Sequence, residues 1–96
     1  MNAAASSGRD APTVMIELMP SEKDLIRAHA LHLHPEVERQ LRDGRYRWIE
    51  FTASDLDDIT GSLSYVCNRT RSRELAVELD AVCSILERHL HAMGRP

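Results

Sequence analysis

Apolar residues recur at helical spacing in the second half of the chain. Between residues 55 and 68 they step by three, four and three positions, which is the spacing of a single apolar stripe on an α-helix. The stripe consists of Leu56, Ile59, Leu63 and Val66. Thr52 or Ser54 is a suitable N-cap, and three aspartates (Asp55, Asp57 and Asp58) lie in the first turn, where negative charge complements the helix dipole. We therefore predict a helix that begins after residue 52 and ends near Asn68.

A second and longer stripe follows the polar segment 69–73, for which Ser72 supplies an N-cap. Its steps of four, three, four and four residues are carried by Leu75, Leu79, Val82, Leu86 and Leu90. The pattern predicts a long final helix that ends near Gly94. Two helices joined by so short a break are expected to form an antiparallel hairpin over residues 53–93, approximately.

This hairpin separates the two cysteines. With the turn centred near Arg71, Cys67 and Cys83 lie about eight residues apart along the axis, or about 12 Å at the α-helical rise. A disulfide needs Cα atoms within about 7 Å. We therefore expect no bond between them, and two reduced thiols, as is usual for a cytoplasmic protein.

The last helix also carries apolar residues away from its main stripe. They are Val77, Ala81, Ile85 and Ala92. A helix that is apolar on two sides is expected to be covered on two sides. The second cover could be an earlier helix, a short ribbon or another copy of the chain. The residues expected in the core or in an interface are Leu75, Leu79, Val82, Ile85 and Leu86.

Two short segments in the first half have the composition of β-strands. Residues 1–12 are small and polar and are expected to form a disordered tail, so the domain proper spans 13–96. Residues 13–19 form a short apolar run, and residues 45–51 contain Tyr46, Trp48 and Phe51. Paired as a two-stranded ribbon, they would need helices on one face for stability. Trp48 and Phe51 are expected in the core.

Two short helices are expected between these strands. The first has Ser21 as its N-cap, with Asp24 returning a bond to the cap, and ends near His32. Pro35 suits the first turn of the second helix, which we expect to end at Asp43 before Gly44. The expected fold is therefore all-α, or mostly α with a minor two-stranded β-ribbon, built on a capped antiparallel helical hairpin.

Composition and charge reduce the number of functional classes to which the chain could belong. The chain has 96 residues, 43% of them apolar and only 4% aromatic, with a net charge of −3. A domain of this size buries a thin core, which oligomerisation commonly supplements. The acidic balance is unlike that of most nucleic-acid binders. No apolar run approaches the roughly 18 residues of a membrane span, and residues 1–12 do not read as a secretory signal, so we expect a cytoplasmic protein without a membrane partner.

The residue patterns give no reason to expect a catalytic site, a cofactor or a metal. His29 and His32 share a helix face, but an H-E-x-x-H motif is missing, and His89 and His91 diverge around their helix. The aspartates near residue 55 already have a role as helix-capping charges. The sequence also lacks a G-x-S-x-G elbow, a glycine-rich phosphate loop and a C-x-x-C pair.

Arginines suggest an alternative function. One group interleaves with aromatic residues and the other lies between the last two helices, and such surfaces bind nucleic acid. The candidates are Arg45, Arg47, Arg69, Arg71 and Arg73. The leading hypothesis is a protein-interaction or self-assembling module, with a homo-oligomer or another protein as partner. The alternative is a small regulator that contacts nucleic acid through this arginine surface.

Overall fold

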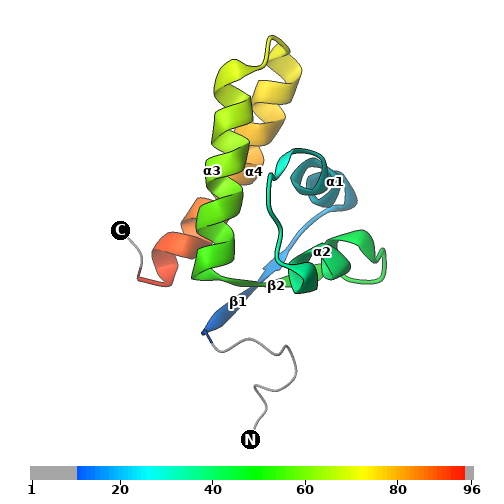
Figure 1. The fold of residues 1–96 in the computed structure, drawn as a ribbon, viewed down its shortest axis with the longest axis vertical. Coiled ribbons are helices and arrows are strands. Elements are labelled where there is room, and N and C mark those ends of the chain that lie inside the picture. Colours follow the sequence, from blue (N-terminus) through cyan, green and yellow to red (C-terminus); the bar gives the residue numbers. More distant parts are fainter. Residues whose placement is uncertain (1–10, 95–96) are drawn as a thin grey trace, which may run out of the picture.

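The computed structural model of the chain describes residues 11–94 and combines four helices with a two-stranded sheet (Figure 1). The predicted tail, residues 1–12, falls outside the described range except for Ala11 and Pro12. The elements in chain order are β1 (Thr13–Glu17), α1 (Pro20–His29), α2 (Pro35–Arg42), β2 (Trp48–Thr52), α3 (Ala53–Arg69) and α4 (Arg73–Ala92). The prediction of a mostly α fold with a minor β-ribbon is confirmed.

The two longest helices form the predicted hairpin. Thr52 caps α3: its hydroxyl accepts from the Asp55 N–H (3.1 Å), and the Asp55 carboxylate accepts from the Thr52 N–H (2.8 Å). Ser72 caps α4 by accepting from the Leu75 N–H. The helices run side by side to a tight turn at the top of Figure 1. Both helices therefore begin where local capping signals predict.

The ribbon pairs β1 with β2 in antiparallel fashion, with Ile16 opposite Ile49 and Met15 opposite Glu50. Residues alternate between faces along a strand. One face is therefore apolar and faces the helices, and it carries Val14, Ile16, Ile49 and Phe51. The other face carries Met15, Trp48 and Glu50, of which Met15 and Trp48 are about half exposed.

The buried core lies between the ribbon, the two short helices and the lower half of the hairpin. Its fully buried side chains come from all six elements, for example Ile16, Ile26, Val37, Phe51 and Leu86. Above this core, every side chain from residue 64 to residue 78 stays at least partly exposed. We call residues 64–78 the distal arm; in Figure 1 it stands clear of the rest of the molecule.

The first helix differs from its prediction at both ends. α1 begins at Pro20, and Glu22, not Asp24, returns the capping bond, accepting from the Met19 N–H at 2.7 Å. Proline loses nothing at the first helical position, since its missing N–H would have no partner there. α1 ends at His29 and not at His32, because the chain turns extended and the Leu31 N–H donates to the Ser62 hydroxyl on α3.

The second strand begins later than predicted, at Trp48 and not at residue 45. The Arg45 N–H and guanidinium both bind the Asp43 carboxylate, and the ammonium of Lys23 donates to the carbonyl oxygens of Asp43 and Tyr46. These bonds hold 43–46 as a turn. Trp48 was wrongly expected in the core: it is 52% exposed, because the strand turns Ile49 and Phe51 inward.

The second helix matches its prediction closely and closes one edge of the ribbon. α2 ends at Arg42, one residue before the expected end. It buries Val37 and Leu41 together with the amide of Gln40. The Gln40 Oε1 accepts from the Glu50 N–H at 3.0 Å, and its Nε2 donates to the Glu36 carbonyl. The outer backbone of β2 is thereby satisfied by a buried side chain at Glu50.

Candidate interaction surfaces

The residues that the sequence singled out on the last helix lie on its inner side. Leu79, Val82 and Leu86 are at most 2% exposed and belong to the central core. Leu75 and Ile85 are half-buried and pack against that core from its border. Within a single chain these five residues therefore act as core or as core border.

Three of the four residues in the second apolar set on α4 stay exposed among the described residues. Val77 is 64% exposed, and Ala81 and Ala92 are exposed as well, whereas Ile85 is half-buried. Neither α1 nor the ribbon covers the outer side of α4. Within residues 11–94 only one side of α4 is packed, so neither an earlier helix nor the ribbon supplies the second cover that was expected.

A shallow hollow of about 220 Å³ lies between α1 and α4, next to this uncovered set. We call it the α1–α4 groove; it is lined by Ser21, Glu22, Leu25, Glu78, Ala81 and Val82. Its apolar lining comes from Leu25, Ala81 and Val82, and carboxylates from both helices border it. A hollow of this size suits one or two side chains of a partner better than a small-molecule ligand, whose pockets usually exceed about 300 Å³.

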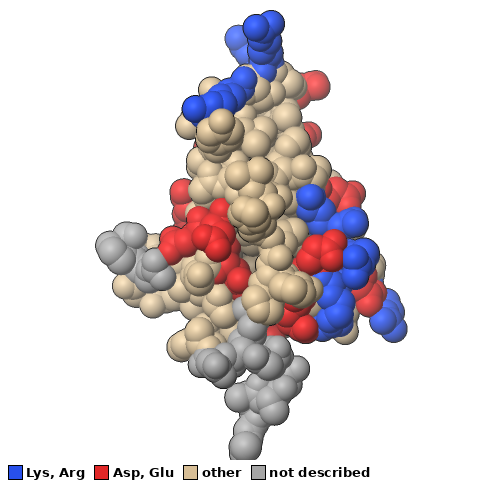
Figure 2. Space-filling model, in the orientation of Figure 1, with Lys and Arg blue, Asp and Glu red and all other residues tan. Residues whose placement is uncertain are grey.

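The structure does not bring the two arginine groups together. Arg69, Arg71 and Arg73 lie at the tip of the hairpin, whereas Arg45 and Arg47 lie in the loop before β2, on the opposite part of the molecule (Figures 1 and 2). In Figure 2 the hairpin tip is the blue cap at the top, and a mixed patch of both charges lies at the lower right.

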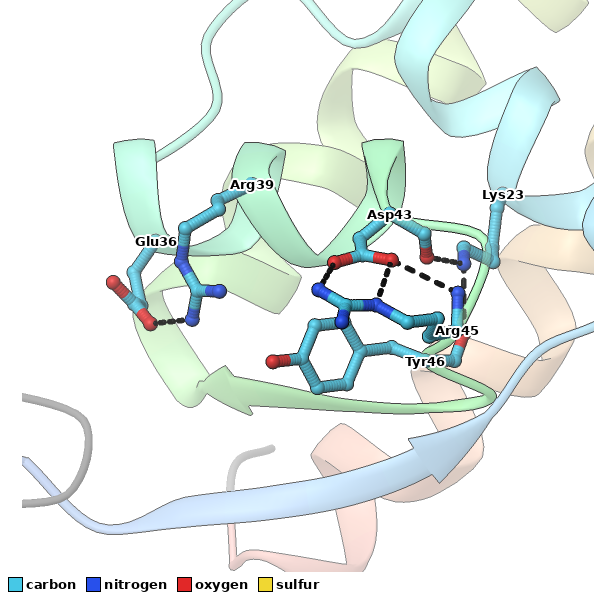
Figure 3. A network of polar contacts seen from close by, with 6 residues as sticks. All are labelled: Lys23, Glu36, Arg39, Asp43, Arg45 and Tyr46. Carbon is cyan, nitrogen blue, oxygen red and sulfur yellow. Dashed lines mark hydrogen bonds and ion pairs between the residues drawn. The ribbon is translucent and has the colours of Figure 1, made fainter.

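The loop arginines are paired with carboxylates. Arg45 binds Asp43 at 2.8 Å, and Arg47 lies 3.9 Å from Glu17. Hydrogen bonds from Arg45 hold the pKa of the Asp43 carboxyl well below its usual range. Figure 3 shows this turn together with Lys23, whose ammonium points into it, and with the neighbouring pair of Arg39 and Glu36. The patch is thus locally neutralised and mainly stabilises the turn.

The arginines at the hairpin tip have a different environment. Arg69, Arg71 and Arg73 are exposed, and no ion pair with a carboxylate joins them to any residue between 11 and 94. The guanidinium of Arg69 lies over the ring of Tyr65, 3.7 Å from its centroid, which is a cation–π contact. Only this half of the predicted arginine surface presents cations free of carboxylate partners.

The histidines serve helix ends or line a hollow. The His34 Nδ1 accepts from the Glu36 N–H at the start of α2, and the His89 Nδ1 donates to the Ile85 carbonyl. His32 and His34 border a hollow of about 300 Å³ that also involves Asp55 and Asp58. Among residues 11–94, however, His, Cys, Asp and Glu side chains do not gather in threes as a metal ion requires. Sequence spacing could not reveal this hollow, because its two sides are about twenty residues apart.

The two cysteines are free thiols at different depths. The Cys67 Sγ donates to the Ala76 carbonyl (3.4 Å), and the Cys83 Sγ lies 3.8 Å from the Thr60 carbonyl oxygen. Each therefore faces a different level of the hairpin, as the predicted geometry required. Burial raises the pKa of the Cys83 thiol.

Comparisons with known proteins gave no match, so any functional proposal rests on the geometry described above. A scan against protein-family models found no match, and searches of curated proteins and of solved structures found no similar chain. Across residues 11–94, the helices lack the combination of length and apolarity that crossing a membrane requires.

Proposed function

We propose that this chain is a small helical protein-interaction module, without a catalytic site of its own, which binds a partner chain at the α1–α4 groove. The observation that carries the proposal is the exposed part of the second apolar set on α4: Val77 is 64% exposed one helical turn before Ala81, which is exposed and lines the groove. Isolated exposed apolar residues need no explanation. Here, however, the exposed positions continue into a hollow between two helices.

The groove suits an amphipathic helix of a partner. Leu25, Ala81 and Val82 offer an apolar lining, and Glu22 and Glu78 border it. A helix that lays an apolar ridge into such a groove is a recurrent mode of peptide recognition. The carboxylates at the border favour a ridge flanked by lysine or arginine. A second copy of the chain is the other possible occupant, in line with a homo-oligomer.

The test uses displayed libraries of helical peptides selected on the full chain. Selected peptides are expected to share an apolar ridge with basic flanks. Ala81→Arg places a long cation in the groove and should weaken their binding by at least roughly tenfold. Ala92→Arg makes the same change at an exposed site of α4 outside the groove and should leave binding unchanged.

Two results would contradict the proposal. One is a set of peptides that bind the Ala81→Arg chain as tightly as the original chain. The other is a chain that forms oligomers whose mass, measured by light scattering, stays the same in Val77→Glu and Ile85→Glu. Oligomers that form through this surface should lose mass in both variants. Val77→Glu is the cleaner of the two, since Ile85 also packs against the core.

The cellular setting we propose is the cytoplasm, with no cofactor required. Two free thiols, one of them buried, are the usual state of cysteines in a reducing compartment. This part of the proposal is checked by locating a tagged chain in fractionated cells. Recovery with secreted or membrane material would refute it.

A second candidate function is contact with nucleic acid at the hairpin tip. It is favoured by the exposed arginines there and by the Tyr65 ring, 54% exposed, which stacks with Arg69. Binding to single-stranded RNA or DNA would weaken steeply with added salt. Arg71→Gln should reduce it, whereas Arg45→Gln should not, because Arg45 is already paired with Asp43. No gel shift at low salt would rule this function out.

A further inference from the structure

Within residues 11–94, the first strand has one edge whose backbone groups have no hydrogen-bond partner. The Leu18 N–H donates to the Arg47 carbonyl (2.8 Å), and the pairing of Ile16 with Ile49 continues the same register. Because hydrogen-bonded pairs alternate along an antiparallel ladder, the N–H and C=O groups of Thr13, Met15 and Glu17 point away from β2. No backbone bond links these groups to another part of residues 11–94.

The two edges of the ribbon differ in whether a side chain bonds their backbone groups. At the β2 edge, the buried amide of Gln40 accepts from the Glu50 N–H. At the β1 edge no such side chain is present within the described residues. Natural edge strands are commonly protected by proline or lysine, and the strand sequence TVMIE contains neither. The β1 edge is therefore available to another β-strand.

We propose that β1 pairs with β1 of a second copy of this chain, antiparallel about a two-fold axis at Met15. The two ribbons then form one continuous four-stranded sheet. This inference uses a surface other than the α1–α4 groove and stands whether or not that groove binds a partner. A two-stranded ribbon is marginal alone, and added strands strengthen it.

The register follows from the strand itself. A two-fold axis at Met15 pairs all five strand residues, with Met15 opposite Met15 and Thr13 opposite Glu17 of the second copy. Thr13, Met15 and Glu17, whose backbone groups point away from β2, form the hydrogen-bonded pairs, and the Cα atoms of such pairs lie about 5.5 Å apart. Glu17 then faces Thr13 of the second copy and not another carboxylate; the Thr13 hydroxyl itself donates to Glu50 at 2.8 Å. A parallel arrangement would instead align each Glu17 with its own copy, which is unfavourable.

Side chains on the outer face complement the backbone pairing. Met15 is 48% exposed and Trp48 is 52% exposed, and both belong to the face turned away from the helices. The two-fold axis places the two Met15 side chains against each other. The exposed apolar surface formed by Trp48 and Met15 then joins the same surface of the second copy across the axis. Flexible methionine side chains adapt well to such a contact, and pairs of this kind stabilise neighbouring strands.

The first experiment measures mass in solution by light scattering over a concentration series in reducing buffer. We expect the chain to pass from 10.9 kDa to twice that mass. Met15→Pro removes the central N–H without breaking a bond to β2, and proline is tolerated at such edge positions. Met15→Lys places two cations opposite each other and serves as the second variant. Both should remain monomers with an unchanged circular dichroism spectrum, whereas Met19→Lys, at an exposed methionine outside the strand, should dimerise normally.

The second experiment tests the register by cross-linking. Under mild oxidation, Met15→Cys should give a covalent dimer, because residue 15 faces itself and the expected Cα distance lies within the range of a disulfide. Thr13→Cys and Glu17→Cys should cross-link when mixed and not when alone. The unsubstituted chain reports any background from Cys67 and Cys83.

Three outcomes would overturn the pairing. They are a strict monomer at every concentration, a dimer that survives both Met15 substitutions, and cross-linking of Met15→Cys no greater than that of Met19→Cys. A dimer that Val77→Glu separates and Met15→Lys does not would assign self-association to the groove. Loss of peptide binding in Ala81→Arg tests the groove independently, so failure of one proposal does not imply failure of the other.

Discussion

The lower half of the hairpin and its distal arm are built from the same two helices but are held in different ways. In the lower half, α3 contacts α1 and β2, and α4 contacts β1. Leu63, Leu79 and Leu86 are fully buried there. In the distal arm, residues 64–78, the two helices pack on each other only through partly buried residues such as Val66, Cys67 and Leu75.

The difference shows how little tertiary contact a helix needs once its local signals are strong. In the arm, Ser72 caps α4, and the turn before it is held by a hydrogen bond that the Ser72 N–H donates to the Thr70 hydroxyl. Segments with few buried apolar contacts open at low free-energy cost. We call the rest of the described chain, residues 11–63 and 79–94, the body. We therefore expect the arm to open well before the body, so that substitutions of the same kind should have unequal effects in the two regions.

The largest contrast is expected between two leucine-to-alanine substitutions on α4. Leu86→Ala removes a side chain that is 0% exposed and should lower the free energy of unfolding by about 2–5 kcal/mol. Leu75→Ala, in the arm, removes a half-buried side chain and should cost roughly 1 kcal/mol. Urea denaturation of both variants measures the difference. Equal losses would mean that the arm is covered as well as the body is, for example by a partner chain.

The next effect concerns a buried cation that the body has and the arm lacks. Lys23 is 5% exposed, and its ammonium binds the carbonyl oxygens of Asp43 and Tyr46. Lys23→Met keeps most of the apolar stem but removes the ammonium from both carbonyls. The Asp43 carbonyl keeps the Tyr46 N–H at 3.2 Å, and the Tyr46 carbonyl loses its donor, which should cost about 1–3 kcal/mol. Arg27→Met, one helical turn later at an exposed ion pair, should cost less than about 1 kcal/mol. Equal melting temperatures for the two variants would refute the anchoring role of Lys23.

The sequence predicted the hairpin well because its signals are local. Caps at Thr52 and Ser72 and the three-four spacing of apolar residues lie within a few positions of the elements they define. The exposure of Trp48 was also readable. In the segment WIEF, Trp48 shares its face with Glu50 and the alternate face carries Ile49 and Phe51. The error came from weighing residue type above the period of two.

The α1–α4 groove and the open strand edge could not be predicted in this way. The groove depends on where α1 docks, and Leu25 carries no local sign that Ala81 and Val82 will face it. The early end of α1 likewise depends on Ser62, a residue 31 positions from Leu31 that accepts its N–H. The strand edge depends on Gln40 covering β2 rather than β1.

A smaller effect of opposite sign is expected at the base of the arm. Gly61 lies within α3 and is exposed, and an added methyl group would meet no atom within 4 Å. Gly61→Ala should therefore stabilise the chain by about 0.5–1 kcal/mol through helix propensity. Gly94→Ala, at φ 90° after α4, makes the same chemical change where alanine is strained, and should destabilise. Urea denaturation compares them. Loss of stability in Gly61→Ala would point to an unseen contact at that face.

The smallest perturbation tests the comparison without any substitution, by the rate at which the two thiols react. Cys67 is half-buried in the arm, whereas Cys83 is 5% exposed and belongs to the buried core of the body. Since the thiolate is the reactive form, the raised pKa of Cys83 leaves less of it at a given pH. Limited alkylation followed by mass spectrometry should therefore modify Cys67 first. The order follows from access as well, because opening of the arm exposes Cys67, while Cys83 additionally requires the body to open. Modification of Cys83 at the same rate as Cys67 would mean that the hairpin opens as one unit, and the division between arm and body would not hold.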